Sequence, residues 1–160
     1  MTIPFVCVLI ALLLIVLSRV PVSMAMGQQE GGYNNHAPRD QQAQLAGWGR
    51  RALAAHQNTI EAFPPFAAGV IISYLAKASL PASTVLCLAF VAARIAYPIL
   101  YIADHDKARS LVWGIGLLAT TVANSAGANG LFYGGGLALM GKQLLAILGT
   151  AAYAFLVTWV

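Results

Sequence analysis

The feature that most constrains this chain is a set of apolar runs, each long enough to cross a membrane. The first extends from Thr2 to Ser18 and continues more weakly to Met26. About 20 apolar residues in a helix span the roughly 30 Å of hydrocarbon in a bilayer. The chain of 160 residues is 59% hydrophobic and only 9% charged, whereas soluble domains are nearer 25% charged. The sequence therefore predicts an all-α integral membrane protein.

The N-terminal run is expected to stay in the protein as a membrane anchor. A cleaved signal peptide carries basic residues before its apolar core. Here the first basic residue, Arg19, follows the run. This order favours a retained helix over a removed leader.

The rest of the chain divides into further spans and the connections between them. Three more spans complete an expected four-helix membrane domain over residues 1–126, at about Trp48 to Ala76, Thr84 to Ala103 and Ser110 to Ala126. The connections are a polar stretch from Gly27 to Gly47, a short link from Lys77 to Ser83 and a charged loop from Asp104 to Arg109. Residues 127–160 are expected to add a glycine-rich turn and a fifth hydrophobic helix, from about Leu137 to Val160.

The distribution of basic residues predicts the orientation in the membrane. Six of them flank the first and third connections, against Lys77 alone in the second: Arg19, Arg39, Arg50, Arg51, Lys107 and Arg109. Because cytoplasmic connections are enriched in Lys and Arg, the N-terminus is expected outside and the first and third connections in the cytoplasm. The nine basic groups are scattered between apolar runs, so no nucleic-acid surface is expected.

Polar side chains enter the second span along one helical face. At helical pitch, Arg51, Asn58 and Glu61 share this face. An ionisable group at the centre of a spanning helix costs about 2.5–3.5 kcal/mol, and such groups usually pair or line a site. The face is therefore a candidate site. The alternative is that Asn58 and Glu61 bridge helices while Arg51 marks the cytoplasmic end of a helix.

A second polar face lies on the third span. Arg94, Tyr97 and Tyr101 share one side of that helix. The expected orientation brings both polar faces and Arg109 toward the cytoplasmic leaflet. One pocket holding all of them is therefore expected.

The remaining histidines and cysteines are given structural roles. His56 lies off the polar face of its helix, which favours a lipid-interface or interhelical hydrogen-bonding role over catalysis. His105 sits between two aspartates in a predicted loop and lacks a further well-placed ligand, so no metal site is expected. Cys7 and Cys87 lie in apolar runs without a Cys-x-x-Cys motif and are expected to be buried, inert thiols.

Three segments carry a family resemblance: NNHAPRDQQAQLAG, RRALAAHQNTIEAFPPF and FVAARIAYPILYIADHDKARSLVW. Together they resemble the MAPEG family, the membrane-associated proteins of eicosanoid and glutathione metabolism, and especially its bacterial members. The most specific parts are Asn58-x-x-Glu61 followed by Phe-Pro, and the Arg94, Tyr97 and Tyr101 pattern with Arg109-Ser110 downstream.

The resemblance implies a bundle of four helices in the bacterial inner membrane that assembles as a homotrimer, with glutathione bound between subunits near the cytoplasmic side. Arg109 matches the catalytic arginine that polarises the glutathione thiol; its alternative role is a cation at the lipid headgroups. The implied glutathione-binding residues are Arg51, Asn58, Glu61, Arg94, Tyr97 and Tyr101. The chain departs from many catalytic members at Ala54, where they carry arginine, and at Trp113, where they carry tyrosine.

Two functions follow as hypotheses. One is a glutathione-dependent transferase or peroxidase that acts on lipophilic electrophiles arriving from the bilayer. The other is a non-catalytic subunit that packs into a larger membrane complex through its extra C-terminal helix. Residues 130–160 are also similar to a late helix of ammonium transporters, over a length too short to form a transport pore.

Overall fold

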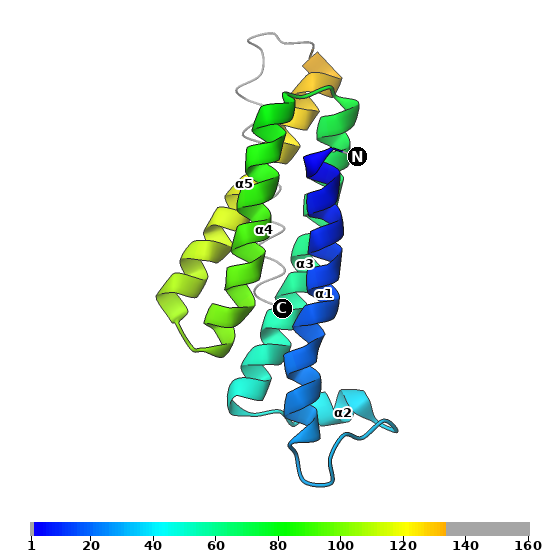
Figure 1. Cartoon of the computed structure of the whole chain (residues 1–160), viewed down its shortest axis with the longest axis vertical. Helices are drawn as coiled ribbons and strands as arrows, with labels where there is room; N and C mark the ends of the chain where they lie inside the picture. The colour runs from blue at the N-terminus through cyan, green and yellow to red at the C-terminus, as the bar shows by residue number, and fades with distance from the viewer. Residues whose placement is uncertain (1, 134–160) are drawn as a thin grey trace.

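The computed structural model describes residues 2–133 of the chain, with side chains described for residues 2–124. All regular secondary structure in this part is helical (Figure 1). The helices are α1 (Ile3–Gly27), α2 (Pro38–Ala43), α3 (Gly47–Leu75), α4 (Leu80–Ile102) and α5 (Asp106–Tyr133). The prediction of an all-α chain is confirmed over these residues.

The four long helices lie side by side and alternate in direction (Figure 1). Helices α3 and α4 contact each other, and each of them also contacts α1 and α5. The start of α1 and the α3–α4 connection lie at one end of the bundle, while α2 and the α4–α5 connection lie at the other (Figure 1). The first and third connections, which carry most of the basic residues, therefore share one end.

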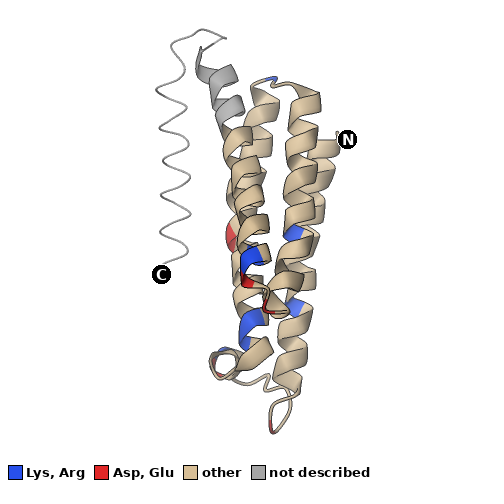
Figure 2. Ribbon diagram, turned by 90° about the vertical axis from the view of Figure 1, so that its left-hand side faces the viewer, with Lys and Arg blue, Asp and Glu red and all other residues tan. Residues whose placement is uncertain are grey.

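Within the described residues, two helices are long and apolar enough to cross a membrane, α1 with 25 residues and α4 with 23. Large apolar side chains on their outer surfaces are exposed, including Leu13, Val16 and Ile99. The upper part of the ribbon is nearly free of charged residues (Figure 2). Such an outer surface suits contact with lipid chains.

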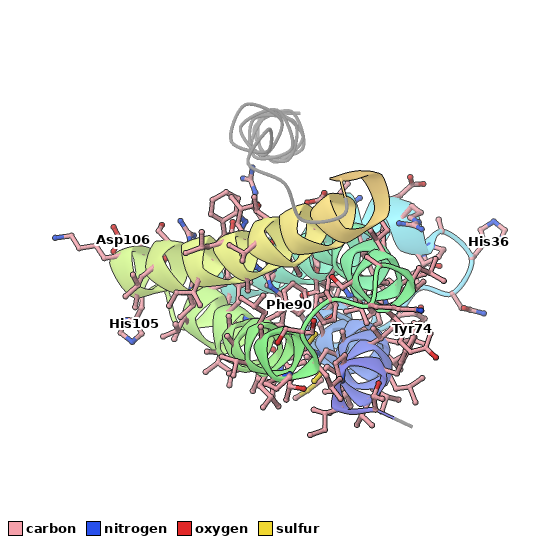
Figure 3. The ribbon with its side chains drawn as sticks, turned by 90° about the horizontal axis from the view of Figure 1, so that it is seen from above. His36, Tyr74, Phe90, His105 and Asp106 are labelled. Carbon is pink, nitrogen blue, oxygen red and sulfur yellow. The ribbon has the colours of Figure 1, made fainter. Side chains whose placement is uncertain are left out.

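The interior is packed around a pair of aromatic rings. Phe66 of α3 and Phe90 of α4 stack with their centroids 3.7 Å apart and their planes within 6°, and Phe90 lies centrally among the helices in Figure 3. Cys7 and Cys87 belong to the same cluster and are each 1% exposed. Their predicted burial is confirmed.

The first connection contains the short helix α2. Gln41 of this helix donates from Nε2 to the carbonyl oxygens of Met26, at 3.1 Å, and of Gly32, at 2.7 Å. It also accepts a hydrogen bond from the backbone N–H of Asn34 at 2.9 Å. One buried amide thus satisfies three backbone groups and holds the connection against the end of α1.

Three boundaries differ from the predictions. Helix α4 begins at Leu80, so the expected link from Lys77 to Ser83 is wrong over residues 80–83; Pro81 fits this first turn, where its missing N–H costs no helical hydrogen bond. Helix α5 begins at Asp106, so the expected charged loop from Asp104 to Arg109 is wrong over its last four residues. The same helix continues to Tyr133, so no glycine-rich turn begins after Ala126. A glycine inside a helix lowers the stability of the helix by only about 1 kcal/mol relative to alanine. Gly127 and Gly130 therefore do not end α5. The fifth helix expected from about Leu137 to Val160 falls outside the described residues.

Candidate functional site

A cavity opens between α3, α4 and α5, toward the end of the bundle that holds the α4–α5 connection. Its volume is about 540 Å³. The residues that line it come from all three helices and are Asn58, Tyr97, Tyr101, Arg109, Ser110, Trp113 and Gly114. Four of the residues predicted for the site therefore meet at one cavity.

Arg94 supports this cavity from inside the bundle. Its side chain is 4% exposed, and Nη1 donates to Oδ1 of Asn58 at 2.8 Å. The guanidinium carbon also lies 5.6 Å from the ring centroid of Phe90 and 5.0 Å from that of Tyr97. Because Oδ1 of Asn58 is engaged, its amide nitrogen is the group that remains to donate to a ligand. Arg94 thereby fixes which way this amide is turned.

The Arg94 guanidinium fits because α5 has a glycine beside it. A Cβ atom added at Gly116 would lie 3.1 Å from Nη2 and 3.3 Å from Nε of Arg94. Nε is buried and has no hydrogen-bond partner among the described residues. In this part of the chain one amide and two aromatic rings hold the charge. An uncompensated buried polar atom of this kind makes the site costly to maintain.

Arg109 brings a second cation to the cavity wall. It lies in the first turn of α5, with its guanidinium carbon 4.3 Å from the ring centroid of Tyr101. Tyr101 in turn meets the ring of Tyr97 edge-on, with centroids 5.5 Å apart. A cation over an aromatic face gains about 0.5–2 kcal/mol. The ring thus holds the charge of Arg109 at the cavity.

Two predicted residues of α3 lie apart from the cavity. Arg51 donates from Nε to the carbonyl oxygen of Ile102 at 3.1 Å and pairs through Nη1 with Asp104 at 3.3 Å. It therefore joins α3 to the α4–α5 connection. Glu61 is half-buried, does not line the cavity, and makes no hydrogen bond or ion pair with the described side chains.

His56 makes the kind of contact that was predicted from the sequence. The ring nitrogen Nδ1 of His56 lies 2.8 Å from Oγ of Ser18 on α1. The Ser18 hydroxyl donates to the carbonyl oxygen of Ile15 at 2.9 Å, so it accepts from Nδ1–H of His56. The predicted interhelical hydrogen bond is confirmed. His105 and Asp106 point away from the bundle (Figure 3).

Three residues of the site were not predicted from the sequence. Ser110 and Gly114 line the cavity, and Gly116 leaves room for Arg94. The signal for the first two was helical periodicity, since positions 109, 110, 113 and 114 lie on one side of a helix. Starting the helix at Ser110 placed Arg109 in a loop and hid this pattern.

Comparison with known proteins gives a family and one short match. An ammonium transporter of Bacillus subtilis (strain 168) is 53% identical over 51 residues, which are 30% of this chain and 12% of the transporter. The chain thus spans a small part of that relative. No solved structure matches the chain. The sequence model that represents the MAPEG family matches residues 3–127 of this chain, from the start of α1 into α5. The chain, an integral membrane protein, therefore belongs to the MAPEG family.

Proposed function

We propose that this protein binds glutathione in the cavity between α3, α4 and α5 and promotes attack of its thiol on lipophilic electrophiles, as a transferase or peroxidase. One observation carries the proposal. The guanidinium of Arg109, held over the Tyr101 ring, shares a cavity with Asn58, whose amide is oriented by the buried Arg94. Membership of the MAPEG family supports the choice of glutathione.

The chemistry of the lining fits this tripeptide. Glutathione carries two carboxylates, one ammonium group, two amides and a thiol, so its net negative charge needs cations and hydrogen-bond donors. Arg109 supplies a cation, and Asn58, Ser110 and the tyrosine hydroxyls supply donors. None of the lining residues is acidic. A volume of about 540 Å³ falls within the roughly 300–1,000 Å³ typical of ligand sites.

Arg109 has the central role in this proposal. Bound glutathione supplies the nucleophilic sulfur. A free thiol has a pKa of about 8.5, and a nearby guanidinium favours the thiolate. Tyr101 keeps the charge of Arg109 in place, while Trp113 closes the wall with a ring that has no hydroxyl to exchange a proton.

The proposal extends to the assembly and the membrane. The end bearing the first and third connections is proposed to face the cytoplasm of a bacterial inner membrane, because those connections hold most of the basic residues. A homotrimer is proposed, with the cavity at a subunit boundary. Arg51 and Glu61 then contribute only if the ligand extends beyond the cavity of one chain. The alternative, a non-catalytic subunit docking through its C-terminal helix, depends on residues outside the described structure.

Turnover by an Arg109→Ala variant tests the proposal. The protein is purified in detergent, and conjugation of glutathione to an aryl halide is followed against pH. Removing one preorganised electrostatic group typically lowers kcat by about 10²–10³. We expect a loss of that order for Arg109→Ala, with the thiol titrating at higher pH than in the wild type.

The matched control is Lys107→Ala, which removes an exposed cation from the same turn of α5. It should leave both the rate and the pH profile unchanged. Calorimetric titration with glutathione, repeated on Arg94→Ala and Glu61→Gln, separates binding from turnover. Binding that is absent at millimolar glutathione, or turnover that survives Arg109→Ala, contradicts the proposed function.

A further inference from the structure

A second cavity lies at the opposite end of the bundle from the Arg109 cavity. Its volume is about 530 Å³. It is bounded by the start of α1, the end of α3, the start of α4 and Ala123 of α5, and most of its lining is apolar: Phe5, Val70, Leu75, Leu80 and Cys87. The outer side chains beside it, Tyr74, Leu75 and Leu80, are exposed. Its walls therefore continue into the surface that faces the lipid.

The charged and polar groups around this cavity give it a positive electrostatic potential. Lys77 is the only charged residue among the described residues that line it. Helices α1 and α4 both begin there, and neither has an acidic residue in its first turn or a side-chain cap on its first backbone N–H groups. Uncapped helix starts carry a partial positive charge and favour anions.

The end of α3 offsets this charge only in part, because three of its last four carbonyl groups already accept hydrogen bonds. The backbone N–H groups of Ala76, Lys77 and Ala78 donate to the carbonyl oxygens of Ile72, Tyr74 and Ser73 at 2.9, 3.1 and 3.0 Å. Lys77 sits in this turn with φ of 52°. The same hydrogen bonds hold its backbone at the mouth of the cavity, and its ammonium group makes no hydrogen bond or ion pair with the described side chains.

We propose that this cavity binds an anionic phospholipid of the surrounding bilayer. One acyl chain enters between α1, α3 and α4, against Val70 and Cys87. The phosphate pairs with Lys77 and with the backbone N–H groups of Leu80 and Ala82, since Pro81 has no N–H and that of Ser83 is bonded to the carbonyl oxygen of Ser79. A water-soluble anion does not use the apolar walls, and a zwitterionic lipid places its own cation near Lys77. The combination of an apolar cavity and a lone cation at its mouth therefore selects an anionic amphiphile.

The test is retention of lipid by the full chain, measured by native mass spectrometry in detergent supplied with equal amounts of phosphatidylglycerol and phosphatidylcholine. The wild type should retain phosphatidylglycerol preferentially. One lysine near a membrane surface changes anionic-lipid binding roughly fivefold, so Lys77→Gln should reduce the preference by about that factor. The matched control is Lys107→Gln, at the other end of the molecule, which should keep the preference.

A second variant tests whether the chain enters the cavity. Ser83 lines the cavity in the first turn of α4, and Ser83→Leu should lower retention of both lipids by narrowing the space. Retention unaffected by Ser83→Leu would show a lipid held at the surface and would overturn the cavity as its site. Equal retention of the two lipids by the wild type, or equal losses in Lys77→Gln and Lys107→Gln, would also overturn the proposal. Glutathione turnover does not enter this test, so its outcome is independent of the proposed function.

Discussion

The hydrogen bond between Arg94 and Asn58 makes a sharp prediction about two variants. Arg94 is 4% exposed, and Asn58 is its hydrogen-bond partner at 2.8 Å. Asn58→Leu removes that partner and leaves a buried guanidinium whose Nε already has no hydrogen-bond partner within the described part of the chain. Arg94→Met removes the charge itself and leaves only a half-buried amide that borders the cavity. The two changes break the same contact but leave different groups behind.

The difference sets the expected magnitudes. A hydrogen bond to a charged group contributes about 1.5–3 kcal/mol, and removing one partner of a buried pair also leaves the other desolvated. Asn58→Leu should therefore lower the free energy of unfolding by about 2–4 kcal/mol. Arg94→Met should cost less, about 1 kcal/mol, since water in the cavity can hydrate the amide of Asn58. With both groups replaced by apolar ones, the double variant should be more stable than Asn58→Leu alone.

The assay is reversible unfolding in mixed detergent micelles, followed by helical circular dichroism for the wild type, both single variants and the double variant. Together these four proteins form a double-mutant cycle. It should give a coupling energy between Arg94 and Asn58 of roughly 1–3 kcal/mol, because the two residues share one interaction. Additive losses would refute the reasoning, since they would mean that Arg94 is stabilised without Asn58. So would an Arg94→Met variant less stable than Asn58→Leu.

Two further predictions concern the packing of the bundle. Gly116→Ala should lower the free energy of unfolding by about 1–3 kcal/mol, because the added methyl group crowds the Arg94 guanidinium. The control is Gly114→Ala, which has nothing within 4 Å of the added Cβ and should be neutral or slightly stabilising in the same unfolding assay. Equal effects of the two changes would contradict the proposed crowding. Ser18→Ala should lower the free energy of unfolding by about 1 kcal/mol, because it removes the hydroxyl that accepts a hydrogen bond from His56. Changing His56 to Phe should then destabilise the Ser18→Ala variant less than it destabilises the wild type. An equal destabilisation in both would show that the hydrogen bond does not stabilise the bundle.

The sequence was informative about the long helices because their signal is local. Apolar runs of membrane length and the order of polar residues along them depend only on the pitch of a helix. The expected span from Trp48 to Ala76 thus agrees closely with α3, Gly47–Leu75. The residues at which helices begin and end were less well predicted. Both ends of α5 lie beyond the expected limits, because neither a charged first turn nor two glycines cost enough to stop a helix held by its neighbours.

Within the site, the sequence identified the residues that face the bundle but not which of them meet. Arg51 and Asn58 share one face of α3 but stand about 10 Å apart along its axis, at 1.5 Å per residue. That separation lets Arg51 reach Asp104 in the α4–α5 connection, while Asn58 meets Arg94 in the interior.

The sequence by itself determined the membrane character of the chain, its helices and the side of each helix that carries polar groups. Only the tertiary structure decided that Asn58, Tyr97, Tyr101 and Arg109 share a cavity while Arg51 is held elsewhere. The physical reason is that helical pitch fixes direction around one axis, whereas contact between helices depends on their spacing, their relative shift and the room left by small residues. Gly116, which makes the space for Arg94, shows this most directly.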